Sequence, residues 1–164
     1  MGGQEVLYYG AEGPSETLSH LRGIDAEAPY IRVSPATQPW KITVISGRIA
    51  SKVIPNHHMV IKLRASFLSR DPEVNKKFAE DKLCHDTGTL EGLAGMIDRA
   101  AALDEGKVVP GKKVKSLWVG FGSGDEIVRC DAAKQFFDRV DIKDKTFKEY
   151  DGWYHVCKSE SASG

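Results

Sequence analysis

The sequence predicts an α/β protein with a parallel sheet, and three observations support this class. Segments with the apolar pattern of a strand alternate with segments that have helical spacing. The stretches between successive strand candidates are long enough to hold crossover helices, which makes the strands parallel. Finally, 41% hydrophobic and 28% charged residues in 164 are ordinary proportions for one domain with a sizeable core.

The first two elements are a short helix and a strand. Val6 and Leu7 lie in a helical segment over residues 2–10, which Gly13-Pro14 follows. Residues 21–33 then read as a strand with an apolar end. Asp25 and Glu27 lie inside it, and such charges are unusual in a parallel strand that is buried on both faces.

Residues 35–88 have the pattern of amphipathic helices inserted into the alternating core. Before Pro55, apolar residues recur at helical spacing: Ile42, Ile45, Ile49 and Val53. Residues 59–67 are predicted to form another short helix, and Asp71-Pro72 begins a charged helix that runs to Lys82.

The alternation resumes after Thr89, and Thr87 or Thr89 is the expected N-cap of the next helix. The remaining elements are expected in this order: a helix from residue 90, a strand at 114–119, a helix at 131–140 and a strand at 145–150. Residues 159–164 are expected to be a polar tail.

Composition excludes several classes of protein. The 23 basic and 23 acidic residues give zero net charge without a long run of one sign, so no nucleic-acid partner is expected. No run of about 18 apolar residues could span a membrane, and the N-terminus lacks the pattern of a signal peptide. The three widely spaced cysteines fit reduced thiols. An intracellular location is therefore predicted, without a metal or cofactor.

Asp125 and His155 are the strongest candidates for chemistry. Each follows a predicted strand and a tight glycine-containing turn, and carboxyl ends of parallel strands meet at one edge of a sheet. A histidine can take the proton of a serine hydroxyl, and a carboxylate on its other nitrogen fixes its tautomer. An acid and a histidine in this order fit the last two members of a Ser…Asp…His triad.

Other interpretations of these residues stay open. Asp125 could cap a turn while His155 is a surface histidine. Residues 120–124, Gly-Phe-Gly-Ser-Gly after a strand, also resemble a dinucleotide-binding turn, although Asp125 would repel a pyrophosphate there. Ser123 is not in a Gly-x-Ser-x-Gly pattern, Cys157 reads as a structural thiol, and His57-His58 lacks further metal ligands at useful spacing.

Four stretches resemble the monoacylglycerol lipase-like α/β hydrolases of the serine aminopeptidase (S33) type, and they span nearly the whole chain. Met1-Gly2-Gly3 is similar to the end of the family's Gly-His-Ser-Met-Gly-Gly elbow, and residues 27–29 resemble the entry to its cap. Residues 120–128 resemble Gly-His-Gly-x-x-Asp-x-x-Val, with Phe121 in place of the histidine. Residues 150–156 resemble Tyr-x-Gly-x-Tyr-His-Val, which is the most specific of the four.

The resemblance implies a role for three residues. Asp125 would be the triad acid and His155 the triad base. Met1 would follow the nucleophile and offer its backbone N–H to the oxyanion. The nucleophilic serine and the segment before it are absent from these 164 residues, so the chain is expected to be the C-terminal part of such a hydrolase and inactive as it stands.

The resemblance also divides the chain and implies its partners. Residues 1–34 would be the helix and strand after the elbow, 35–88 a helical cap, and 89–158 the C-terminal core with the last three or so parallel strands. An acylglycerol or another small ester would be the substrate of the intact enzyme. The cap would line an acyl pocket and touch a membrane or lipid-droplet surface. The alternative is a non-catalytic protein that binds lipid or a partner.

Overall fold

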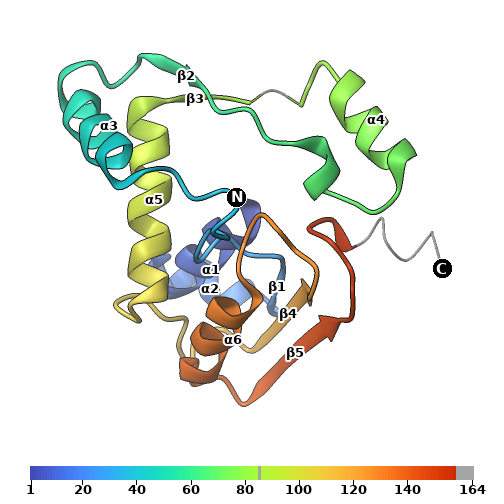
Figure 1. The fold of residues 1–164 in the computed structure, drawn as a ribbon. Helices are drawn as coiled ribbons and strands as arrows, with labels where there is room; N and C mark the ends of the chain where they lie inside the picture. Colours follow the sequence, from blue (N-terminus) through green and yellow to red (C-terminus); the bar gives the residue numbers. More distant parts are fainter. Residues whose placement is uncertain (85, 158–164) are drawn as a thin grey trace.

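The computed structural model describes residues 1–84 and 86–157, and a three-stranded parallel sheet lies at its centre. The strands are β1 (Ile24–Glu27), β4 (Ser116–Gly122) and β5 (Asp144–Tyr150). Their order in the sheet is β1-β4-β5, with both pairs parallel (Figure 1). The predicted α/β class with a parallel sheet is therefore confirmed.

β1 is much shorter than the strand predicted over residues 21–33. It ends at Glu27 because Ala28 adopts a positive φ of 39°, which turns the chain away from β4, and a proline follows. Val33 makes only an isolated bridge to Val128. The prediction of one long strand was wrong because residues 30–33, in which Tyr30, Ile31 and Val33 are apolar, form an irregular segment.

The two acidic residues of β1 lie on an open face of the sheet. Asp25 and Glu27 are exposed while their neighbours in the strand are buried. On β5, Thr146 and Lys148 are exposed as well. In the part of the chain that the structure describes, the sheet thus has one solvated face, and this explains charges that a doubly covered strand would exclude.

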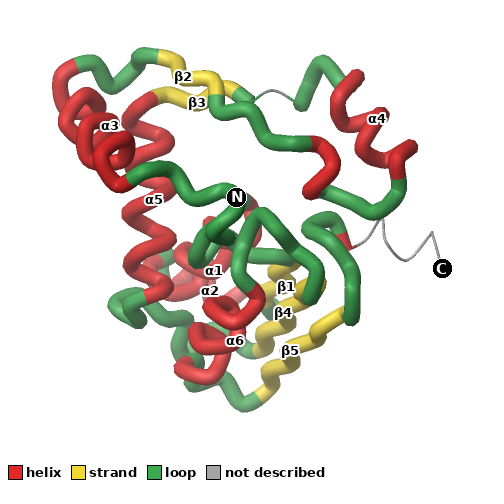
Figure 2. The backbone as a smooth tube through the Cα atoms, viewed as in Figure 1, coloured by secondary structure: helices red, strands yellow, loops and turns green. Residues whose placement is uncertain are grey.

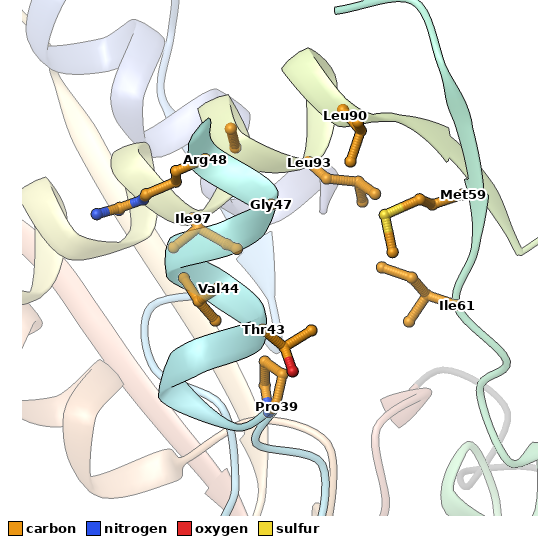
Figure 3. A pocket seen from close by; sticks show the side chains of 11 residues that line it. Pro39, Thr43, Val44, Gly47, Arg48, Met59, Ile61, Leu90, Leu93 and Ile97 are labelled. Carbon is orange, nitrogen blue, oxygen red and sulfur yellow. The ribbon is translucent and has the colours of Figure 1, made fainter. Parts of the chain in front are cut away.

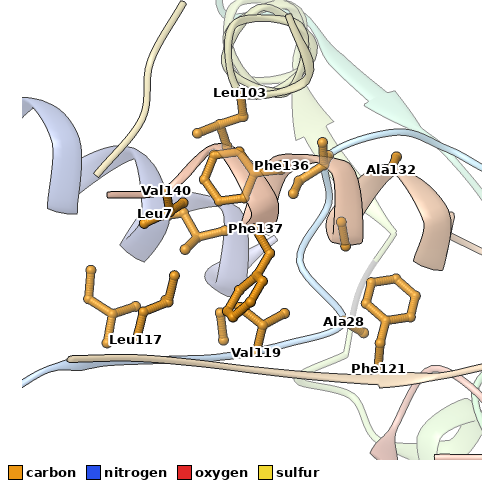
Figure 4. Packing of buried hydrophobic residues seen from close by; sticks show 14 of the residues in the cluster. Leu7, Ala28, Leu103, Leu117, Val119, Phe121, Ala132, Phe136, Phe137 and Val140 are labelled. Carbon is orange, nitrogen blue, oxygen red and sulfur yellow. The ribbon is translucent and has the colours of Figure 1, made fainter. Parts of the chain in front are cut away.

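Helices cover the other face and enclose the core. α1 (Gly2–Glu12), α5 (Leu90–Asp104) and α6 (Cys130–Arg139) lie over the side chains that β4 points toward them (Figure 4). The short α2 (Ser15–His20) follows α1. The core gathers these buried side chains: Leu7, Leu103, Leu117, Val119, Phe121, Ala132, Phe136 and Val140.

A separate lobe holds the segment predicted to be a cap. It contains α3 (Lys41–Val53), α4 (Pro72–Glu80) and a short 3₁₀ turn, η1 (Ala65–Phe67). β2 (His58–Val60) and β3 (Thr87–Thr89) pair antiparallel in the same lobe, apart from the main sheet (Figure 2).

The helix predicted over residues 59–67 was wrong. Met59 and Val60 belong to β2 and pair with Gly88 and Thr87, so their backbone groups are satisfied by a segment far along the chain. The charged helix is present as α4, and the Asp71 carboxylate caps it by accepting the Glu73 N–H at 2.9 Å.

α5 connects this lobe to the core. The Thr89 hydroxyl caps it by accepting the Gly92 N–H at 3.1 Å, as the sequence predicted. Its side chains contact α3 at one end and the buried core at Leu103 at the other. The boundaries at residues 34/35 and 88/89 stay a prediction, and residues 158–164 lie outside the described part.

No helix in the described residues has the length and apolar character that crossing a membrane requires.

Candidate active site

Asp125 is held in place by the turn that follows β4. Its own N–H donates to the Gly122 carbonyl at 3.2 Å. One carboxylate oxygen, Oδ1, accepts the backbone N–H groups of Ile127 at 2.8 Å and Val128 at 3.1 Å. The side chain is only 1% exposed. A buried carboxylate with these two donors has a single orientation, and its second oxygen points to a fixed place.

His155 meets that second oxygen. Its Nδ1 lies 2.8 Å from Asp125 Oδ2, and its side chain is 22% exposed. Because an ionised carboxylate can only accept, Nδ1 carries the proton, and in the neutral ring Nε2 keeps its lone pair. The structure thus brings together the two residues singled out in the sequence, with the Nε2 side of the imidazole facing away from the carboxylate.

Glycines let the two turns approach each other. A Cβ on Gly122 would lie 2.2 Å from the Trp153 carbonyl oxygen, and one on Gly124 would lie 3.1 Å from the Gly152 carbonyl oxygen. Gly152 itself has a φ of 69°, in the left-handed region. Backbone contacts therefore set the position of the His155 turn relative to Asp125, and side chains at 122 or 124 would separate them.

The first turn of α1 reaches the same edge of the sheet. A Cβ on Gly3 would lie 3.1 Å from the Glu27 carbonyl oxygen, at the carboxyl end of β1. The Met1 carbonyl accepts the N–H groups of Gln4 and Glu5 and so begins the helix. Burial lowers the pKa of the Met1 amine, which the Glu5 carboxylate partly opposes. Its role as an oxyanion donor stays a prediction.

Two cysteines lie near this edge, and Cys130 is a poor nucleophile. Burial, followed by the charges of Glu149 and Asp131, raises the pKa of Cys130 to about 11, so its thiol stays protonated at neutral pH. Cys157 is buried, and its thiol donates to the Tyr154 carbonyl at 3.8 Å. Cys130 therefore supplies no activated thiolate to His155.

The rival interpretations fit the geometry less well. Asp125 does cap a turn, but it also holds a mostly buried imidazole. The same carboxylate fills the place where a dinucleotide phosphate would bind, and α6 begins only at Cys130. His58 lies in β2, opposite Thr89. Within residues 1–84 and 86–157, no three acidic, histidine or cysteine side chains gather as a metal site would require.

Sequence reasoning missed the backbone donors to Asp125. An aspartate whose carboxylate accepts N–H groups two and three residues later forms an Asx-type turn. The signal was present in Asp125-Glu-Ile-Val, because such a turn commonly precedes a helix, and here α6 follows.

An apolar cavity lies between α3 and α5, away from Asp125 and His155. Its volume is about 90 Å³. Figure 3 shows side chains from both helices and from the β2 segment around it. The lining includes Pro39, Val44, Met59, Leu93 and Ile97, with Arg48 as its charged member. A second hollow of about 330 Å³ beside Tyr30 and Val33 shares Pro39, Val44 and Ile97 with it.

Residues 1–162 match the family model described as serine aminopeptidase, S33 (Hydrolase_4). The chain belongs to this family. Its fold is that of the monoacylglycerol lipase-like α/β hydrolases, as the motifs around Asp125 and His155 suggested.

Curated relatives carry lipase names. A protein of Schizosaccharomyces pombe named "Putative monoglyceride lipase" is 31% identical over 161 residues, which cover 98% of this chain and 41% of that protein. The "Monoacylglycerol lipase" of Mycolicibacterium smegmatis is 29% identical over 168 residues, which cover 98% of this chain and 54% of that protein. The chain thus spans about half the length of these relatives.

Two solved structures share the fold. A monoacylglycerol lipase of Paleococcus ferrophilus superposes with a TM-score of 0.79 at 23% identity, covering 93% of this chain and 56% of that one. A soluble variant of the monoglyceride lipase of Saccharomyces cerevisiae superposes with a TM-score of 0.81 at 21% identity, covering 93% of this chain and 51% of that one. At these identities the likeness concerns the fold alone.

Proposed function

We propose that this chain supplies the acid and the base of a serine ester hydrolase that cleaves acylglycerols. The observation that carries the proposal is the 2.8 Å contact between Asp125 and His155 Nδ1, which leaves Nε2 as the basic nitrogen. Membership of the S33 family and the lipase names of the relatives support the reaction class and the substrate class.

In the proposed mechanism His155 acts first as a base and then as an acid in each half of the reaction. His155 Nε2 takes the proton of a serine hydroxyl as its oxygen attacks the ester carbonyl, and Asp125 stabilises the imidazolium. The C–O bond to glycerol then breaks, and His155 returns the proton to the departing glycerol oxygen. Water, activated by the same nitrogen, cleaves the acyl-enzyme to fatty acid and serine.

The serine must come from outside these 164 residues under this proposal. The sequence contains no Gly-x-Ser-x-Gly. Ser123 lies near the pair Asp125 and His155, which we call the dyad. Its hydroxyl already donates to Asp151 and accepts from the Gly152 N–H. We therefore propose that the chain alone forms no acyl-enzyme.

We further propose that the cavity between α3 and α5 takes part of an acyl chain. Its lining is almost wholly apolar, and it adjoins the larger hollow beside Tyr30 and Val33. Such a lining suits methylene groups, whose transfer from water contributes about 0.8 kcal/mol each.

The experiment restores a nucleophile where the family resemblance expects one. Gly-His-Ser is added directly before Met1, which turns the terminal amine into a backbone N–H. A fluorophosphonate probe should label the added serine, and His155→Ala should abolish the labelling. Matched controls are the unextended chain and the chain extended with Gly-His-Ala, both of which should stay unlabelled.

Two results would contradict the proposal. One is a folded, extended chain, verified by its circular dichroism, that the probe does not label. The other is labelling that persists at the same rate in His155→Ala.

A second candidate function, lipid-surface binding without catalysis, is favoured by one observation. The residues spaced along α3 at helical intervals point to solvent instead of the core. Their exposed fractions are 72% for Ile42, 59% for Ile45, 63% for Ile49 and 76% for Val53, and the preceding Trp40 is 80% exposed. An apolar stripe with an aromatic residue at its end is typical of helices that lie in a membrane interface. We propose a membrane or lipid-droplet periphery as its place.

Vesicle flotation tests this second function. The chain should float with phosphatidylcholine vesicles, and the double variant Ile45→Glu/Ile49→Glu should lower the bound fraction at least tenfold. Ile45→Leu keeps the apolar surface and should bind like the parent. Thr17→Glu adds a charge on exposed α2, outside the stripe, and should also leave binding unchanged. Equal flotation of the parent and all three variants would reject the α3 stripe as the binding surface.

A further inference from the structure

Ser123 connects the two turns that carry Asp125 and His155. Its hydroxyl donates to Asp151 Oδ1 at 3.1 Å and accepts the Gly152 N–H at 2.7 Å. Ser123 lies two residues before Asp125, whereas Gly152 lies three residues before His155. The hydroxyl therefore joins the turn that carries Asp125 to the turn that carries His155, on the exposed side of both.

Backbone hydrogen bonds bring the same two turns together. The Ser123 N–H donates to the Tyr150 carbonyl at 2.9 Å, and the Gly124 N–H donates to the Trp153 carbonyl at 2.9 Å. These bonds set the distance between the turns. They leave the middle of the β5 turn, Asp151-Gly152, to be held by the Ser123 side chain.

That middle contains the glycine of the turn, which has open space around it. Gly152 is exposed, has a φ of 69°, and has no atom within 4 Å of an added Cβ. A glycine in such open space has many accessible conformations. The hydroxyl of Ser123 holds its N–H, while Tyr150 and Trp153 stack with ring centroids 4.3 Å apart at the two ends of the turn.

We propose that Ser123 is a positioning residue that holds the 150–153 turn so that His155 Nδ1 stays on Asp125. The inference rests on the proposed function in assigning the dyad a chemical task, but the contact that it concerns exists in the chain as it stands. Ser123 acts through Gly152 and touches neither Asp125 Oδ2 nor the imidazole in the hydrogen bonds described here. It is a positioning residue and not a second nucleophile.

The test follows the Nδ1 proton of His155 by NMR in the complete chain. The parent should show a downfield imidazole N–H resonance at low temperature, assigned by its loss in His155→Gln. In Ser123→Ala the exchange of this proton with water should become about two- to tenfold faster, because the turn loses both hydrogen bonds of the Ser123 hydroxyl, each of which makes a modest net contribution. Ser123→Thr retains the hydroxyl and should restore the parent rate.

A matched serine on the same strand provides the control. Ser116 begins β4, at the end away from the dyad, and its hydroxyl donates to the Arg22 carbonyl at 3.0 Å. Ser116→Ala loses a comparable exposed bond and should leave the Nδ1 proton unchanged. Asp151→Ala removes one of the two Ser123 contacts, so its rate should lie between those of the parent and Ser123→Ala.

Equal exchange rates in the parent and in Ser123→Ala would overturn the proposal, as would equal acceleration in Ser116→Ala. If Ser123→Ala fails to fold, Asp151→Ala decides by the same comparison with Ser116→Ala. The proposed function fails separately: an extended chain that fluorophosphonate does not label would reject catalysis, yet leave the effect of Ser123 on His155 standing.

Discussion

At the scale of single residues, the environment of Asp125 explains why a carboxylate can stay buried at the end of β4. Its two oxygens accept from Ile127, Val128 and His155, so the loss of water is offset by three donors. A carboxylate so fixed can orient an imidazole without moving itself. The same three contacts distinguish this aspartate from the exposed Glu126 next to it.

Cys130 should make the stability of the chain depend on alkaline pH. Its pKa rises from 9.0 to about 11 on folding, first through burial and then through Glu149 and Asp131, with Lys134 acting in the opposite sense. Because the folded pKa is the higher one, the stabilisation is complete below pH 9 and is lost as the pH rises toward 11. Urea unfolding at pH 8 and pH 10.5 should show a decrease in unfolding free energy that is smaller in Cys130→Ser.

The comparison of the parent with Cys130→Ser isolates the contribution of Cys130, because the lysines and tyrosines that titrate at high pH are common to both proteins. The same pH-dependent loss in Cys130→Ser as in the parent would show that this thiol does not contribute.

At the scale of elements, apolar spacing identified the segments whose partners lie on one face. The helices α3 and α6 and the strand β5 lie within a residue of the predicted bounds. The predictions of a helix over residues 59–67 and of a strand over residues 21–33 were wrong for one shared reason. β2 depends on pairing with β3, which is distant in the sequence, and β1 ends because Ala28 has a positive φ. Neither a distant partner nor a single dihedral angle leaves a periodic pattern of apolar residues in the sequence.

The position of the dyad was more predictable than these elements. The pattern at residues 150–156 and the glycines before Asp125 place both groups at the carboxyl ends of neighbouring strands, and a parallel sheet then brings them together. The orientation of α3 could not be predicted in this way. A helical stripe shows that one face is apolar but not whether the core or the solvent receives it.

Gly122→Ala should disturb the joined turns. The new Cβ would lie 2.2 Å from a backbone oxygen of Trp153, which cannot move aside as a flexible side chain would. We expect a loss of about 1–3 kcal/mol in unfolding free energy, measured by urea titration. The His155 Nδ1–H resonance should shift as well.

Gly111→Ala is the control for this prediction. No atom lies within 4 Å of its added Cβ, and its φ is not in the left-handed region, so its stability should equal or slightly exceed that of the parent. Equal stability of Gly122→Ala and Gly111→Ala would contradict the close approach of the two turns.

At the scale of the whole molecule, α5 is the element that the two lobes share. Arg48 of α3 pairs with Asp98 in the middle of α5, and Leu103 near the end of α5 is fully buried in the core. The helices that cover the sheet all lie on one face, and the other face carries exposed charges. α3 itself has no buried residue, and its lobe adds Leu68 to the core, so we expect the stability of this lobe to depend on that core.

Leu103→Ala should reveal this dependence. Removing a fully buried leucine side chain costs about 2–5 kcal/mol. Hydrogen exchange should show faster opening in α3 as well as in α5 and α6. The control, Leu83→Ala, truncates a side chain that is 86% exposed and should change stability by less than about 0.5 kcal/mol. Unchanged exchange in α3 of Leu103→Ala would mean that the two lobes open independently.

The contacts of Thr89 limit how the lobe with α3 can move relative to the core. Thr89 closes β3 opposite His58, and its hydroxyl holds the first turn of α5, while Leu90 and Glu91 donate to the carbonyls of His57 and Pro55. These hydrogen bonds connect the β2–β3 pair and the first turn of α5 into one unit. Any movement of this lobe away from the sheet must change the backbone of the connecting segment 34–40. A crosslink at that segment would therefore prevent the movement, whereas a crosslink across the β3–α5 junction would not.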